Sequence, residues 1–176
     1  MAETRKGEVT MRGNPVELVG PKLKAGETAP DFACVDGDMG TVNLKTSAGK
    51  VRFFNVVPSL DTPVCSIQTK KFSEEFTALG DKVAAFTVSL DLPFAQKRFC
   101  TDNKIENLVN LSDTHNHSFG EHYGVLISSL PIPLLARAIF VVDAKDMIRY
   151  VEVVPEIASE PNYEAALAAL KSTMGA

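Results

Sequence analysis

Cys65 stands where the reactivity of a thiol is enhanced, because it follows a predicted buried strand and opens a predicted helix. Thr62 suits the N-cap of that helix, and Pro63 suits its first position because proline has no N–H to leave unsatisfied there. Cys65 then falls in the first turn, where free backbone N–H groups and the positive end of the helix dipole favour a thiolate. We expect the pKa of Cys65 to lie below the free-thiol value of about 8.5, which makes it a nucleophile at neutral pH. The hydroxyl of Thr62 is one turn away, within reach of the sulfur or of a bound substrate oxygen.

The alternative is that Cys65 only packs, because unpaired cysteines are among the most buried residue types. A second cysteine, Cys100, favours the reactive interpretation. It lies on the helix predicted over residues 93–103, and the loops that follow neighbouring parallel strands open on one edge of a sheet. The two cysteines form no Cys-x-x-Cys motif, and thiols on separate helices are not expected within ~7 Å, so a bridge between them requires local unwinding. Cys34, which alternates with Phe32 on a predicted strand, is interpreted as a small buried hydrophobe.

Apolar runs alternate with helical patterns along the chain and predict the elements that position these cysteines. Four apolar residues around the turn signal at 12–15 predict a hairpin within residues 1–27. The order of the later elements predicts an α/β fold, in which a mixed central sheet carries helices on both faces. We expect a single domain over residues 1–176, with the hairpin as an extension. The predicted strands cover residues 51–57, 83–90, 107–111, 138–142 and 148–154, and the predicted helices cover 63–79, 93–103 and 161–173.

Composition excludes several classes of protein. The chain has 176 residues, of which 45% are hydrophobic and 23% charged, and this excludes a disordered chain. A net charge of −4 argues against nucleic-acid binding, which needs a dense positive surface. No apolar run is long enough to span a membrane, and residues 1–10 lack the apolar core of a secretion signal, so we expect a cytoplasmic protein that binds no membrane. Three cysteines are too few for a disulfide-stapled scaffold.

Several segments resemble a known family. Residues 58–65 resemble the peroxidatic motif Pro-x-x-x-Thr-x-x-Cys of the peroxiredoxins, and residues 29–32 are similar to their entry strand. Other segments resemble the bacterial thiol peroxidases, an atypical 2-Cys subfamily, so that the resemblance covers nearly the whole chain. These are residues 91–96, 98–100, 123–125, 136–138 and 161–167.

The resemblance implies a thioredoxin-like fold, a homodimer and a peroxidase that needs no cofactor. It implies that Cys65 attacks the O–O bond of hydrogen peroxide or an organic hydroperoxide and becomes a sulfenic acid. Cys100 then forms a disulfide with Cys65 in the same chain, which thioredoxin reduces. We expect both helix ends to loosen when Cys65 is oxidised.

Three further residues are candidates for this chemistry. A leaving alkoxide or hydroxide is best stabilised by fixed donors, which Thr62, the N–H of Cys65 and a guanidinium would supply. Arg137 fits the last role because it stands alone among apolar residues, although a structural ion pair is its alternative. Pro58 would shield the sulfur from water, or would simply end the strand.

Two segments carry weaker signals. All three histidines, His115, His117 and His122, lie close to Asp113, but their spacing fits no standard metal site and an exposed polar loop is the better interpretation. The apolar residues 127–135 are predicted to form a loop that lines a substrate entrance, contacts a subunit or packs internally.

Two alternatives to a peroxidase use the same sequence features. The first is a sensor or redox relay in which Cys65 passes oxidation to a client protein. The second is a thioredoxin-like domain whose Cys65 is an ordinary buried thiol. Steady turnover of a hydroperoxide with thioredoxin would distinguish the peroxidase from both.

Overall fold

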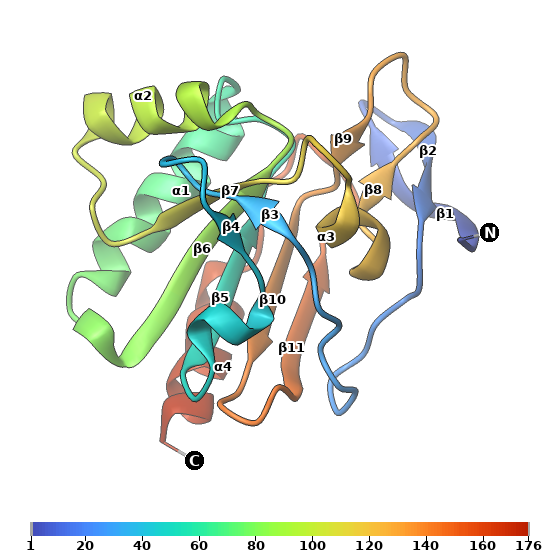
Figure 1. Ribbon diagram of the computed structural model, residues 1–176. Helices are drawn as coiled ribbons and strands as arrows, with labels where there is room; N and C mark the ends of the chain where they lie inside the picture. The colour runs from blue at the N-terminus through green and yellow to red at the C-terminus, as the bar shows by residue number, and fades with distance from the viewer. Residues whose placement is uncertain (1, 176) are drawn as a thin grey trace.

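A seven-stranded mixed sheet runs through the middle of the computed structural model, which describes residues 2–175 (Figure 1). The sheet has the strand order β11-β10-β5-β6-β7-β3-β4. Its three central strands, β5, β6 and β7, are parallel, and β10 pairs antiparallel with β5. The strands are β3 (Cys34–Val35), β4 (Thr41–Val42), β5 (Val51–Val56), β6 (Val83–Ser89), β7 (Val109–Ser112), β10 (Ala138–Val142) and β11 (Ile148–Val153). The predicted mixed sheet is therefore present.

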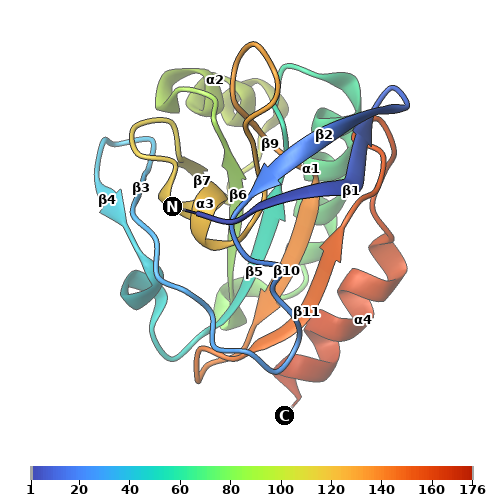
Figure 2. The same cartoon turned by 90° about the vertical axis from the view of Figure 1, so that its right-hand side faces the viewer.

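A second, four-stranded sheet contains the predicted N-terminal hairpin (Figures 1 and 2). Its order is β1-β2-β8-β9, with β1 (Thr4–Met11), β2 (Asn14–Val19), β8 (Leu126–Ile127) and β9 (Leu134–Leu135). The prediction of a loop over residues 127–135 was therefore wrong at both ends. The hairpin strand β2 offers backbone partners to β8, and the side chains of Leu126, Ile127 and Leu135 are buried at this contact.

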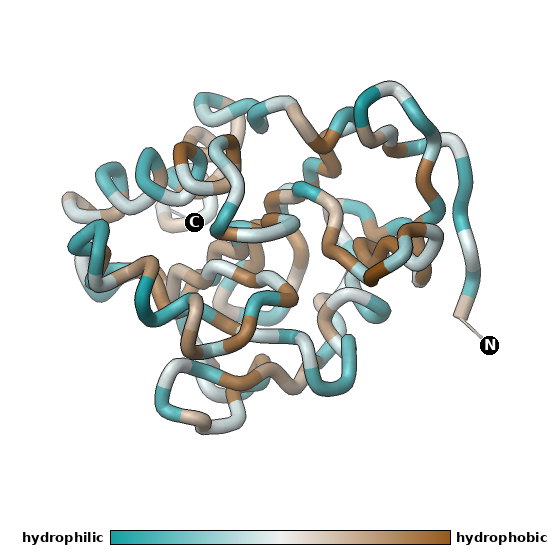
Figure 3. Tube along the Cα trace, turned by 90° about the horizontal axis from the view of Figure 1, so that it is seen from above, coloured by the Kyte–Doolittle hydropathy of each residue, from teal (hydrophilic) through white to brown (hydrophobic). Residues whose placement is uncertain are grey.

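Helices cover both faces of the large sheet (Figures 1 and 2). Because successive side chains of a strand point to opposite faces, Phe53 and Phe54 of β5 belong to two different apolar clusters. Phe53 packs with α1 (Pro63–Phe76) and α4 (Tyr163–Met174), and residues of α2 (Pro93–Asn103) pack against the same cluster. Phe54 packs on the other side with Phe119 of the short helix α3 (Ser118–His122). Seen from above, apolar residues gather in the interior while the outer loops are mostly hydrophilic (Figure 3).

Both helices that carry the candidate cysteines start at the same edge of the sheet. The strands β5 and β6 are parallel neighbours, and α1 and α2 follow them in the chain. Each helix begins with a proline, at Pro63 and Pro93, as its fixed φ and missing N–H favour. The predicted helix 63–79 ends earlier, at Phe76, and Asn107 donates hydrogen bonds to its last turn, at the Ser73 carbonyl (2.6 Å) and the Thr77 hydroxyl (3.1 Å). No helix within residues 2–175 has the length and apolar character to cross a membrane.

A close backbone approach fixes the segment after the hairpin against the end of α3. Gly124 has a positive φ of 67°, and a Cβ there would lie 1.8 Å from the carbonyl oxygen of Pro21. Gly49 has a similar φ of 80°, but a Cβ there would meet nothing within 4 Å. Alanine at either position would pay the energetic cost of a positive φ, but only alanine at Gly124 would also clash with a neighbouring backbone atom.

We predict that Gly124→Ala lowers the free energy of unfolding more than Gly49→Ala does. The control should lose only about 1–2 kcal/mol, the cost of a left-handed conformation in a residue with a Cβ. Gly124→Ala must also displace the backbone at Pro21. Urea denaturation of both variants measures the difference, and equal losses would contradict the close approach.

Candidate functional site

Cys65 lies in the first turn of α1, as the sequence predicts. Thr62 is the N-cap, with extended backbone angles, and the helix starts at Pro63. The N–H of Ser66 donates to the carbonyl of Thr62 (3.0 Å), whereas the N–H of Cys65 has no acceptor within residues 2–175. The helix end therefore leaves an unpaired backbone donor at Cys65.

The guanidinium of Arg137 lies against the sulfur of Cys65. Its Nη2 is 3.3 Å from Sγ, although the two residues are 72 positions apart in the chain. Arg137 is only 2% exposed, and no carboxylate forms an ion pair with it within residues 2–175. The alternative of a structural ion pair is therefore wrong. A buried cation next to a sulfur stabilises negative charge on that sulfur, as the chemistry of a thiolate nucleophile requires.

Neutral acceptors hold Arg137 in this position. Nε donates to the carbonyl of Ile157 (2.9 Å), and Nη1 donates to Oε1 of Gln68 (2.8 Å). Because neither acceptor carries a formal charge, these two hydrogen bonds do not neutralise the positive charge of the guanidinium beside the sulfur.

Two side chains that sequence reasoning missed continue this network through the interior. Gln68 donates from Nε2 to Oδ1 of Asn55 (2.5 Å), and Asn55 donates to the hydroxyl of Thr69 (3.1 Å). Thr69 in turn donates to the carbonyl of Cys65 (2.9 Å). The contacts close a ring that begins and ends at Cys65 and passes through Arg137, and all of its side chains are buried. The available signals were a glutamine three residues after the cysteine, on the same helix face, and an asparagine inside an apolar strand.

Thr62 and Pro58 lie near the cysteine but do not hydrogen-bond it. The hydroxyl of Thr62 is exposed and donates to the carbonyl of Ser59 (2.9 Å). Pro58 is buried directly after β5. Their catalytic roles therefore stay predictions.

Apolar side chains cover the sulfur in this conformation. Cys65 is 0% exposed and forms a small cluster with Val57 and Leu60, against which Phe99 of α2 packs. The side chains around the sulfur thus come from the segment before α1 and from α2, and together they leave Cys65 without exposed surface.

Cys100 occupies a different environment, although it follows Phe99 directly. It is partly exposed, packs against the larger cluster beneath α1, and accepts a hydrogen bond from Asn110 Nδ2 (2.7 Å between nitrogen and sulfur). Burial raises the pKa of the Cys100 thiol, and the Asn110 contact opposes this effect in part. Cys65 and Cys100 are both free thiols and belong to different clusters, which agrees with the expectation that a bridge requires rearrangement.

The third cysteine is remote from this chemistry. Cys34 is fully buried, and its Sγ lies 3.5 Å from Oδ1 of Asp113. Burial raises the pKa of Cys34, and the neighbouring carboxyl group adds to the shift. Asp113 itself accepts the N–H groups of Phe119 (3.0 Å) and Gly120 (2.7 Å). The pair therefore anchors α3 to the core, as the structural interpretation of Cys34 predicts.

The histidine segment gathers no metal-binding set within residues 2–175. His115 and His122 are exposed, and Nδ1 of His122 lies 2.6 Å from the carbonyl oxygen of Asp31. His117 is the N-cap of α3. Asp113, which is near these residues in sequence, is buried and bound to backbone N–H groups.

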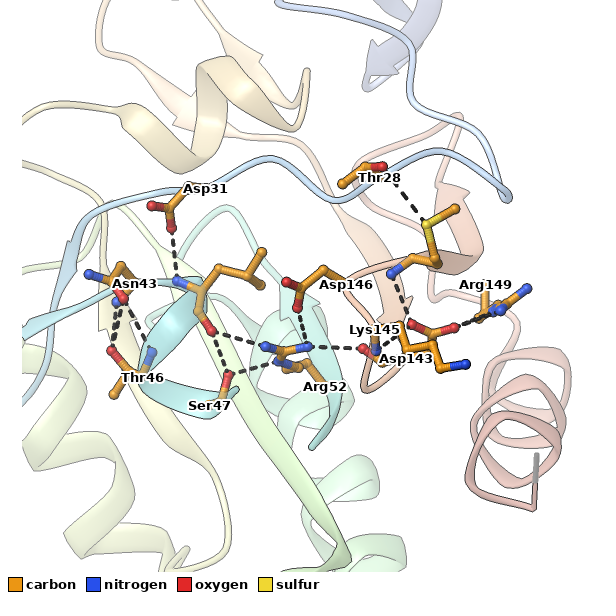
Figure 4. A network of polar contacts seen from close by, with 12 residues as sticks. Thr28, Asp31, Asn43, Thr46, Ser47, Arg52, Asp143, Lys145, Asp146 and Arg149 are labelled. Carbon is orange, nitrogen blue, oxygen red and sulfur yellow. Dashed lines mark hydrogen bonds and ion pairs between the residues drawn. The ribbon is translucent and has the colours of Figure 1, made fainter. Parts of the chain in front are cut away.

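A second buried arginine, Arg52, provides a contrast to Arg137 (Figure 4). It lies near the start of β5, at the opposite end from Cys65. Its nitrogen atoms donate to the Ser47 hydroxyl (2.9 Å) and to the carbonyl of Leu44 (3.0 Å), and it pairs with the Asp146 carboxylate (2.7 Å). Arg52 is thus an ion-paired structural residue, the role that the sequence left open for Arg137.

Comparison with known proteins identifies the family. The Redoxin family model matches residues 24–167. Thiol peroxidase of Listeria innocua is 51% identical over 164 residues, 93% of this chain and 98% of that protein. Thiol peroxidase of Halalkalibacterium halodurans is 48% identical over 166 residues, 94% of this chain and 98% of that protein.

Solved structures agree with this assignment. The crystal structure of a peroxiredoxin-like protein from Aquifex aeolicus matches with a TM-score of 0.88 and 42% identity, over 96% of this chain and 98% of that one. A thiol peroxidase from Chromobacterium violaceum matches with a TM-score of 0.82 at 19% identity, over 93% of this chain and 95% of that one, and shares the fold. The chain therefore belongs to the Redoxin family, in its peroxiredoxin branch of thiol peroxidases, and is a thiol-based peroxidase with a thioredoxin-like fold.

Proposed function

We propose that Cys65 is the peroxidatic residue and that it reduces hydrogen peroxide and organic hydroperoxides. The observation that carries the proposal is the guanidinium of Arg137 against the Cys65 sulfur, at the N-terminus of α1. The Cys65 thiolate attacks the terminal oxygen of the hydroperoxide and the O–O bond breaks. Cys65 becomes a sulfenic acid, and the departing oxygen takes a proton and leaves as water or an alcohol.

Donors around the sulfur stabilise the charge that develops on the departing oxygen. Arg137 supplies a fixed cation, and the unpaired N–H of Cys65 supplies a backbone donor. The exposed hydroxyl of Thr62 donates to the Ser59 carbonyl in the resting enzyme. In our proposal it turns to the bound peroxide, while Pro58 restricts water at the site.

Cys100 completes the cycle within the same chain. Its thiolate attacks the sulfenic sulfur of Cys65, which forms a disulfide and releases water. The dithiol of thioredoxin then reduces this disulfide and returns both cysteines to thiols. The partial exposure of Cys100 supports this role, as does the position of α2 next to the Cys65 loop. A homodimer and a cytoplasmic location remain predictions of the sequence.

Serine variants test the two cysteine roles. Cys65→Ser should abolish peroxide consumption because no nucleophile remains at the end of α1. Cys100→Ser should consume one equivalent of peroxide per chain and then stop with thioredoxin, because no disulfide forms. Peroxide assays with thioredoxin, its reductase and NADPH measure both. Cys34→Ser is the control and should cycle as the wild type does. Normal cycling by Cys100→Ser would reject Cys100 as the resolving residue, and a wild type that reacts only once would indicate a sensor.

Substitution of Arg137 tests its role in the reaction, and the same substitution of the buried Arg52 is the control. We expect Arg137→Lys to lower the second-order rate constant for peroxide by about 10²–10³-fold, the effect of removing one fixed donor from a developing negative charge. Lysine retains the charge but not the planar fork that holds sulfur, Gln68 and Ile157 together. Arg52→Lys should lower the free energy of unfolding but leave the rate constant of the folded enzyme within about threefold. Equal rate effects in the two variants would contradict a direct role for Arg137.

Alkylation reports the protonation state of Cys100. Because burial raises its pKa, the thiolate of Cys100 should appear at higher pH than that of a free cysteine. The rate of Cys100 modification by iodoacetamide, followed by peptide mass spectrometry, should therefore rise with a midpoint above about 8.5. Asn110→Ala should move the midpoint further upward, because the Asn110 hydrogen bond favours the thiolate. A midpoint below that of free cysteine would contradict the assigned environment.

A further inference from the structure

The carboxylate of Asp91 joins the loop before Cys65 to the loop before α2. Its Oδ1 accepts a hydrogen bond from the Ser59 hydroxyl (2.7 Å), and its Oδ2 accepts one from the Leu60 N–H (2.8 Å). A third bond reaches Oδ2 from the hydroxyl of Ser89, at the end of β6 (2.8 Å). Hydrogen bonds to a charged acceptor are stronger than those between neutral groups, so this contact is a strong one between the two loops.

Asp91 is itself fixed to the sheet. Its carbonyl accepts a hydrogen bond from the Ser112 hydroxyl of β7 (2.6 Å), and its N–H donates to the Ser89 hydroxyl (3.3 Å). Gln96 of α2 donates to the same hydroxyl (3.0 Å). Asp91 is therefore held at the edge of the sheet, and its carboxylate anchors the loop that contains Ser59 and Leu60.

This loop controls both the cover and the start of α1. Leu60 packs directly on Cys65, so the bond to its N–H keeps the sulfur covered. Ser59 also accepts the N–H of Asp61 at its hydroxyl (3.2 Å) and the hydroxyl of Thr62 at its carbonyl (2.9 Å). Release of Ser59 would therefore loosen the turn that leads into the N-cap of α1.

We propose that Asp91 is a positioning residue that latches the Cys65 loop closed and thereby restrains formation of the Cys65–Cys100 disulfide. The inference rests on the proposed disulfide mechanism. While the latch is closed, Leu60 packs on Cys65, and the sulfurs of Cys65 and Cys100 belong to different clusters, both of which Phe99 contacts. Opening the latch lets the start of α1 unwind, and the Cys100 thiolate then attacks the sulfenic sulfur with release of water.

The latch sets a partition between two fates of the sulfenic acid. In the open form Cys100 converts it to a disulfide. In the closed form Leu60 stays in place, and a second hydroperoxide that enters past Phe99 oxidises the sulfenic acid to a sulfinic acid, with breakage of the peroxide O–O bond and release of water or an alcohol. A tighter latch therefore makes the enzyme more sensitive to inactivation by excess peroxide.

The test uses Asp91→Asn, which keeps the size of the side chain but removes its charge and one of its two acceptor oxygens. Asp143→Asn is the matched control. Asp143 is also partly buried and accepts two backbone N–H groups, those of Lys145 and Met147 (2.9 Å each), but it lies at the other end of the sheet (Figure 4). The intact protein reacts with one equivalent of hydrogen peroxide in one series and with an excess in a second, and each reaction is quenched with acid and alkylated. Mass spectrometry quantifies the disulfide peptide over time in the first series and the sulfinic peptide in the second.

We expect Asp91→Asn to raise the first-order rate of disulfide formation about tenfold, the effect of losing one hydrogen bond to a charged acceptor. The fraction of Cys65 converted to sulfinic acid per turnover should fall by a similar factor in excess peroxide. The second-order rate constant for peroxide should stay within about threefold of the wild type, because Arg137 is held by other elements and the first peroxide also enters past Phe99, which Asp91 does not bind. The control should change none of these quantities by more than about twofold.

Ser59→Ala provides a second variant, because it removes one donor to the carboxylate and should shift the partition in the same direction. A disulfide rate and a sulfinic fraction that match the Asp143→Asn control would overturn the latch, as would a slower disulfide step. If the wild type itself yields no linked peptide between Cys65 and Cys100, the proposed disulfide mechanism fails rather than the latch.

Discussion

The candidate site depends on a buried guanidinium that forms no ion pair with a carboxylate within residues 2–175. Arg137 would be costly to bury if its donors were unsatisfied, and the structure meets this cost with Gln68, a backbone carbonyl and the sulfur of Cys65. A carboxylate at the place of Gln68 would neutralise the cation and weaken its effect on the sulfur. The neutral amide of Gln68 therefore holds the guanidinium of Arg137 without neutralising its charge, which acts on the sulfur of Cys65.

The sheet makes this arrangement possible by bringing distant segments to one edge. β5 leads to Cys65, β6 leads to the loop with Asp91, and Arg137 stands directly before β10, which pairs with β5. The ring of hydrogen bonds fixes the helix end to the strand through Asn55. Two kinds of contact thus meet at Cys65. A polar ring holds the cation, and Leu60 and Phe99 form an apolar cover over the sulfur.

Sequence reasoning reached the parts of this site that have local signals. Pro63 and Cys65 reveal the helix end because capping and proline preferences act within one turn. Arg137 was conspicuous because a single cation in an apolar run must find acceptors. Gln68 and Asn55 gave only weak signals, since each looks like one polar residue in an ordinary helix or strand. Their function depends on a contact between α1 and β5 that no local rule specifies. The strand β8 was missed for the same reason, because its partner β2 lies more than a hundred residues away, and β9 pairs in turn with β8.

The neighbouring residues Phe99 and Cys100 connect α2 to the packing around Cys65. On a helix, consecutive side chains point about 100° apart, so Phe99 reaches the Cys65 cluster as well as the cluster beneath α1, while Cys100 packs, partly exposed, against the latter alone. In the proposed cycle the sulfur of Cys100 has to leave this packing to meet the sulfur of Cys65. Because both residues belong to α2, a displacement of this helix would move both side chains together. Access to the Cys65 sulfur and resolution of its oxidised form would then be coupled through one helix.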